Sequence, residues 1–155
     1  MIGIMKTILR TAAVALFMAL VAVAAVSCTY LGKNKLEEKV DSLSKDLPKE
    51  ITSVMKVTDL MYNTSRNVLE ITYTWDVTPD DIAWTTAEER QQEVLQLVSI
   101  KKLDDRLPDL IDKARAGIVV VVHLSDGSEA ATISYPNIAT FDKAAKGTAK
   151  NVAYE

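Results

Sequence analysis

An apolar segment close to the N-terminus limits what this chain can become. Residues 11 to 26 (TAAVALFMALVAVAAV) carry no charge, and only two basic residues and no acidic residue precede them. Small residues then lead into Cys28, the only cysteine of the protein. A positive start, an apolar stretch and small residues at its exit are the three parts of an export signal. The sequence therefore predicts a domain that folds outside the cytoplasm.

The residues before Cys28 resemble the end of a bacterial lipoprotein signal peptide. Ala25, Val26 and Ser27 suit the lipid-modifying and cleaving enzymes, although Leu is the commonest residue of that family where Ala25 stands. The resemblance implies cleavage between Ser27 and Cys28, a diacylglycerol on the Cys28 sulfur and a further acyl chain, such as palmitate, on its nitrogen. Two or three acyl chains hold a protein on a membrane for practical purposes permanently. We therefore expect a signal peptide at residues 1–27 and a membrane partner reached through Cys28.

Two other interpretations of the leader stay open. Residues 25 to 27 also suit an ordinary signal peptidase, which would release a soluble protein. Residues 11 to 32 are uncharged, so an uncut leader could instead span a bilayer with its basic residues on the inside. All three interpretations place the domain outside the cytoplasm.

Charge and composition exclude several classes of function. Residues 1–27 hold Lys6, Arg10 and no acid, which leaves 128 residues with 16 basic and 21 acidic side chains and a net charge of −5. An acidic chain of this length forms one domain and has no electrostatic reason to bind nucleic acid. One cysteine and one histidine cannot make an internal disulfide or a Cys/His zinc site. We expect no metal and no cofactor.

The chain after the leader is expected to fold as one globular domain at residues 35–147. Residues 28–34 would be the lipidated Cys28 and a short tether, and residues 148–155 a flexible tail. Six tether residues reach at most about 20 Å, so the domain would lie close to the bilayer. The residue after Cys28 is Thr29 rather than Asp, which resembles outer-membrane lipoproteins of enteric-type bacteria.

Helical patterns begin and end this domain. Apolar residues at steps of three and four predict a first helix over residues 34 to 47. Thr85 opens a further helix in capping-box spacing. Another helix follows a kink, and Gly117 is placed to cap its end. A short final helix is expected over residues 137 to 146.

Strand patterns predict two β-hairpins. Residues 69 to 77 alternate apolar and polar side chains, and a less regular strand over 53 to 62 precedes them. Residues 118 to 124 (IVVVVHL) are apolar on both faces, which predicts a strand that is central or covered on two sides. The turn signal Asp126-Gly127 then leads into a strand over 129 to 135.

The expected order is helix, hairpin, helix, helix, hairpin, helix. It predicts an α+β fold with a four-stranded, mainly antiparallel sheet and helices packed on one main face. Residues 47–51 (LPKEI), 67–69 (NVL) with Tyr73, Gly117 and 126–127 (DG) resemble small exported bacterial proteins of unknown function. That resemblance implies a fold and no activity.

Few residues suggest a functional site, and none of them is assigned as catalytic. His123 is the only imidazole and lies in an apolar strand, where a structural role is expected. The acidic residues between 104 and 112 are interpreted as a solvated helix face. Tyr73 and Trp75 share a strand face and Trp84 precedes a helix, so they form either core or an interaction surface.

These features predict a membrane-anchored lipoprotein of the bacterial envelope with a non-catalytic binding, structural or accessory role. An envelope protein is the expected partner, and the domain would lie in the periplasm or on the cell surface, at the outer membrane rather than the inner one. The alternatives are an inhibitor or immunity-type protein and a small envelope hydrolase. A deep pocket that joined His123 to several acids would favour the hydrolase.

Overall fold

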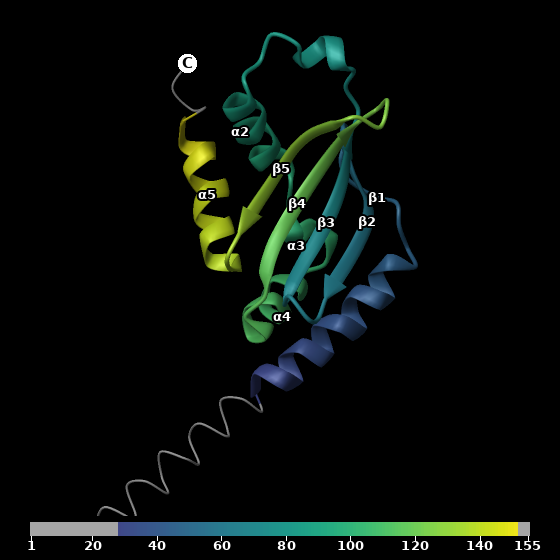
Figure 1. Ribbon diagram of the computed structural model, residues 1–155, viewed down its shortest axis with the longest axis vertical. Helices are drawn as coiled ribbons and strands as arrows, with labels where there is room; N and C mark the ends of the chain where they lie inside the picture. The colour runs from purple at the N-terminus through teal and green to yellow at the C-terminus, as the bar shows by residue number, and fades with distance from the viewer. Residues whose placement is uncertain (1–27, 152–155) are drawn as a thin grey trace, which may run out of the picture.

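The computed structural model describes residues 28–151 of the chain, with side chains up to residue 147 (Figure 1). A helix over residues 28–44 comes first, and we call it the N-terminal helix. The elements that follow are β1 (Lys49–Thr52), β2 (Met55–Asn63), β3 (Val68–Trp75), η1 (Pro79–Ile82), α2 (Ala87–Leu97), α3 (Ile100–Leu103), α4 (Leu107–Ala114), β4 (Gly117–Leu124), β5 (Glu129–Tyr135) and α5 (Ile138–Asn151).

The five strands form one mixed sheet in the order β1-β2-β3-β4-β5. All neighbours are antiparallel except β3 and β4, which run parallel from the pair Val68 and Gly117 to the pair Trp75 and Leu124. The α+β class is confirmed. The two expected hairpins are present as β2–β3 and β4–β5, and most neighbours are antiparallel. The expected count of four strands is wrong, because the sheet has five strands, and the sheet is mixed because β3 and β4 run parallel.

The additional strand, β1, arises from a tight reversal within a short segment. Lys49 and Glu50 pair with Val57 and Lys56 of β2 after a turn of two residues. The sequence pattern merged that turn with the start of the strand expected at 53 to 62. Four residues carry too little periodicity to be recognised as a strand by themselves.

The parallel pairing of β3 with β4 follows from the long connection between them. Parallel neighbours need a crossover of a dozen or more residues, whereas a hairpin joins antiparallel ones. Here η1, α2, α3 and α4 together form that crossover, and it places β4 in the interior of the sheet. The central position expected for residues 118 to 124 is therefore confirmed.

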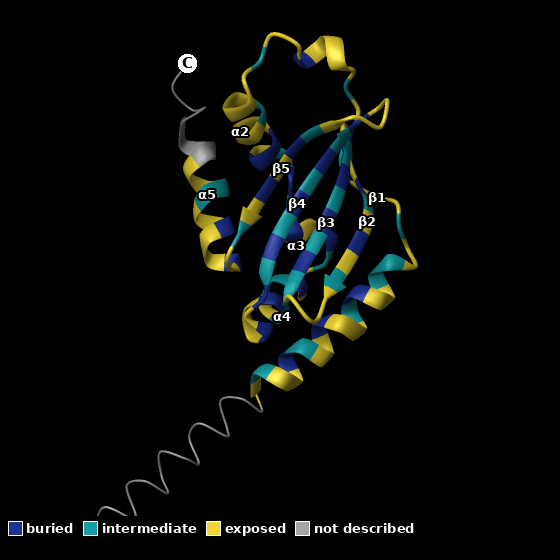
Figure 2. Ribbon diagram, viewed as in Figure 1, coloured by how far each residue is buried: buried dark blue, intermediate teal, exposed yellow. Residues whose placement is uncertain are grey.

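The helices cover one face of the sheet and leave the other open. In β3 and β4 each buried side chain alternates with a half-buried one, which indicates one covered face and one exposed face (Figure 2). We call the second surface the open sheet face. Its centre is formed by Thr72, Thr74, Val119, Val121 and His123.

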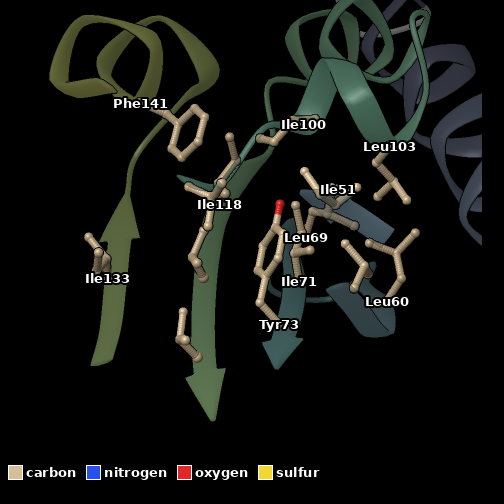
Figure 3. Close-up of a cluster of buried hydrophobic side chains, with 14 of the residues drawn as sticks. Ile51, Leu60, Leu69, Ile71, Tyr73, Ile100, Leu103, Ile118, Ile133 and Phe141 are labelled. Atoms are coloured by element: carbon tan, nitrogen blue, oxygen red, sulfur yellow. The ribbon is translucent and has the colours of Figure 1, made fainter. Parts of the chain in front are cut away.

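The core fills the space between the covered face and the helices. Figure 3 shows Leu69, Ile71 and Tyr73 of β3 beside Ile118 of β4, with side chains from α3 and α5 above them. The N-terminal helix joins the same core through Leu36 and Val40, which are 0% and 3% exposed. One continuous cluster therefore connects the elements from this helix to α5.

The N-terminal helix includes residues 28–34, for which a tether was expected. Gly32 is buried against the end of α4, where an added Cβ atom would lie 2.6 Å from the carbonyl oxygen of Lys113. Since Gly32 already packs on the domain, the chain from Cys28 to this contact is about 6 Å of helix rather than an extended linker.

An ion pair fixes the same helix to the α3–α4 junction. Lys39 Nζ lies 2.6 Å from Asp104 Oδ2, and both side chains are half-buried. The pKa of the Asp104 carboxyl lies below its usual value: partial burial acts to raise it, but hydrogen bonds from Lys39 and from the backbone N–H of Arg106 outweigh that effect.

The helix ends differ in detail from the sequence pattern. The N-cap of α2 is Thr86, whose Oγ1 accepts a hydrogen bond from the N–H of Glu89 at 3.2 Å, so the expected cap at Thr85 is one residue early. Gly117 is not the cap of α4, because Arg115 takes the left-handed conformation there (φ 51°). Gly117 starts β4, where a Cβ atom would lie 3.3 Å from the carbonyl oxygen of Tyr135.

The last helix, α5, continues to Asn151, into the range where a flexible tail was expected.

Candidate partner-binding site

The predicted lipidation residue lies at the edge of the described structure. Cys28 is exposed, and its thiol is not part of a disulfide. The predicted signal peptide at residues 1–27, with the predicted cleavage after Ser27, lies outside the described residues. Between residues 28 and 151, no helix combines the length and apolar character that crossing a membrane requires.

The three aromatic residues of the expected interaction surface separate into two groups. Tyr73 and Trp75 are 0% and 3% exposed, so the structure places them in the core and not on a surface. Their strand alternation points both side chains to the covered face of β3. Trp84 is 80% exposed, and its indole Nε1 donates a hydrogen bond to the carbonyl oxygen of Asp81 at 2.9 Å. Only Trp84 is available to a partner.

The buried hydroxyl of Tyr73 stands out within this apolar core. Figure 3 shows it pointing from β3 into the helix layer. The oxygen has no hydrogen-bond partner among the described residues. Burial raises the pKa of the Tyr73 hydroxyl well above its usual value, so the group stays neutral.

His123 and the acids of α4 do not converge. His123 is half-buried on the open sheet face, opposite Thr74 of β3 and Glu129 of β5. Asp109 and Asp112 are exposed on α4, and α4 is among the helices that pack on the other side of the sheet. No group of three His, Cys, Asp or Glu residues between positions 28 and 151 is arranged to hold a metal ion.

A groove lies between the α2–α3 junction and α5, and we call it the helix groove. Its volume is about 830 Å³, and Pro108 at the start of α4 is among its lining residues. The groove exists because α2 ends at Leu97 and the chain is extended at Val98 and Ser99 before α3 begins. Ser99 caps the new helix by accepting a hydrogen bond from the N–H of Lys102 at 3.2 Å.

The floor of the helix groove is apolar. Val98, Ile100 and Phe141 form its base as part of the core. Leu97, Pro108 and Ala145 also line the groove and are half-buried, so they keep apolar surface that a ligand could cover.

The rim of the helix groove is basic, in contrast to the rest of the chain. Lys101 and Lys102 of α3 and Lys146 of α5 line it and are exposed, and Asp142 is the one acid among the lining residues. Ion pairs in the described part of the chain join only Lys39 to Asp104 and Lys113 to Asp109. The three rim lysines are therefore not neutralised by ion pairs with the described residues.

Sequence reasoning did not find this groove. Its walls come from segments about forty residues apart, and each segment taken alone shows only an ordinary amphipathic pattern. The available signal was local: Lys101-Lys102 follows the apolar run Leu97-Val98 in a chain that is otherwise acidic.

Known proteins share the fold of this chain but not its sequence. No protein-family model and no curated protein matches the sequence. The structure is similar to that of EpsS, a pilotin from the type 2 secretion system of Vibrio vulnificus, with a TM-score of 0.51 and 16% identity over 74% of this chain and 96% of EpsS. At this level of identity the likeness shows a shared fold. The structure is also similar to that of AspS, a type II secretion system pilotin from Vibrio cholerae, with a TM-score of 0.50 and 13% identity over 72% of this chain and 94% of AspS.

Proposed function

We propose that this protein is a lipid-anchored accessory protein of the bacterial envelope, with a role of the pilotin kind. Its domain binds a protein component of an envelope assembly, and Cys28 carries the lipid that holds the pair at the outer membrane. The observation that carries the proposal is the likeness to two pilotins, each covered almost completely by this domain.

Two further observations support the anchor. The leader has the three parts of an export signal and ends in small residues before the only cysteine. In the structure Cys28 is exposed, and Gly32, four positions later, is already packed on α4. An anchor at Cys28 would hold the domain at the bilayer surface, where an envelope partner can be met.

A non-catalytic role agrees with the distribution of reactive groups. General acid–base catalysis needs donor and acceptor groups within hydrogen-bond reach of one reacting atom. His123 lies on the open sheet face, whereas Asp109 and Asp112 belong to a helix that packs on the other side. The separation of His123 from the α4 acids, together with the fold likeness to two pilotins, supports binding through a surface.

The anchor is tested by replacing Cys28 in the full-length protein in its native host. We expect Cys28→Ala to abolish incorporation of labelled palmitate and to remove the protein from the outer-membrane fraction, because the acyl chains supply the membrane affinity. Ser53→Ala, an exposed change in the turn after β1, is the matched control and keeps both properties. A wild-type protein without acyl chains on Cys28 refutes the anchor.

The accessory role is tested by deleting the gene in the native host. Loss of the protein should reduce the amount of one envelope complex at the outer membrane, and the wild-type gene should restore it while Cys28→Ala should not. Unchanged envelope complexes after deletion would contradict the accessory role and leave the anchor untouched.

A further inference from the structure

The geometry points to the helix groove as the binding site for an acidic, amphipathic segment of a protein partner. Such a segment places apolar residues on the groove floor and carboxylates beside the rim lysines. This inference rests on the proposed function, since it names the surface and the partner chemistry through which the accessory protein would act.

The floor supplies the apolar part of the interaction. Leu97, Pro108 and Ala145 are held half-buried around a base of core residues, so the surface is preformed. Covering preformed apolar surface releases its hydrating water and needs little reordering of the protein. A segment with two or three apolar side chains on one face would fit this floor.

The charge of the rim lysines determines which partner segments the groove attracts. Lys101, Lys102 and Lys146 against Asp142 give the groove a local charge of +2, whereas the chain after residue 27 has a net charge of −5. A positive rim on an acidic domain repels basic segments and selects acidic ones, because charge complementarity acts mainly on specificity and on the association rate.

The shape of the groove favours a protein segment over a small molecule. Its volume of about 830 Å³ is within the range of ordinary ligand sites, but helices bound it on its sides and its rim lysines are exposed to solvent. Partner segments commonly bind such grooves by laying an apolar face on the floor.

The inference is tested by photocrosslinking in the full-length, membrane-anchored protein in its native host. Benzoylphenylalanine replaces Gln96 or Ala145, which line the helix groove, or Thr132, which is exposed on the open sheet face. We expect both groove positions to crosslink a protein segment with net negative charge and apolar residues on one side, identified by mass spectrometry. The control position should not crosslink that segment.

Charge reversal at the rim supplies the second arm of the test. A synthetic peptide with the crosslinked sequence is titrated into the purified protein at low and at high salt. We expect Lys101→Glu combined with Lys102→Glu to weaken binding at least about tenfold, and salt to weaken binding to the wild type. Lys45→Glu, an exposed lysine of the segment before β1, is the matched control and should leave the affinity unchanged.

Several results would overturn the inference. They are a crosslinked segment without net negative charge, a crosslink only to a lipid or to a second copy of this chain, no crosslink from either groove position, or unchanged peptide affinity after the double reversal. A partner captured only from Thr132 refutes the groove and leaves the proposed function standing. An unlipidated protein that still captures an acidic segment refutes the anchor and leaves the groove standing.

Discussion

At the scale of single residues, one hydroxyl group is buried in the apolar core without a hydrogen bond to a described residue. Tyr73 is fully buried, and its oxygen has no partner among the described residues. A buried polar group without a hydrogen bond costs about 1–3 kcal/mol. Tyr73→Phe keeps the ring and removes that cost, so we expect the free energy of unfolding in urea to rise by about 1 kcal/mol. A fall of that size would show that the hydroxyl is bonded in solution, for example to an ordered water.

A second tyrosine provides the control for Tyr73→Phe. The hydroxyl of Tyr62 donates a hydrogen bond to Asn67 Oδ1 at 2.6 Å, so Tyr62→Phe should lower the free energy of unfolding by about 1 kcal/mol. High pH provides a second test of Tyr73. The raised pKa of Tyr73 means that the unfolded chain loses its proton first, so stability falls as the pH rises above about 10. Tyr73→Phe should remove that part of the pH dependence.

At the scale of elements, two glycines in helices make opposite predictions. Alanine is favoured over glycine in a helix by about 1 kcal/mol. At Gly147 of α5 an added Cβ atom meets nothing within 4 Å, so Gly147→Ala should raise the melting temperature. At Gly32 the Cβ atom would lie 2.6 Å from the Lys113 carbonyl oxygen, so Gly32→Ala should instead destabilise by about 1–3 kcal/mol. Stabilisation by both changes would show that the N-terminal helix does not pack on α4.

Local patterns predicted the type of most elements and the two hairpins β2–β3 and β4–β5, but not the other strand pairings. The alternation from Leu69 to Trp75 identified β3 and the side chains that share one of its faces, because side-chain direction in a strand depends only on position. The pairing of β3 with β4 depends on how the long crossover packs, which no local pattern contains. β1 was missed for a related reason: Lys49–Thr52 is too short to show a period and becomes a strand by pairing with β2.

The candidate site was harder to predict than the fold, because a surface depends on which side chains the fold leaves exposed. Tyr73 and Trp75 share the alternation of their strand, and that alternation alone could not decide whether their face was core or groove. The helix groove combines a helix break at Val98 and Ser99 with α5, so it exists only after α5 has packed. The exposure of Trp84 agrees with its position before a helix.

At the scale of the whole molecule, the continuous core predicts a single unfolding transition. The cluster joins Leu36 of the N-terminal helix to Phe141 of α5, so no element can leave without exposing apolar surface of the others. In Trp84→Phe the remaining indole is the buried Trp75, whose emission reports the core, while far-UV circular dichroism reports the helices. We expect the two signals to change at the same urea concentration. Loss of helical signal before the Trp75 signal would mean that part of the helix layer unfolds separately, and it would contradict one cooperative domain.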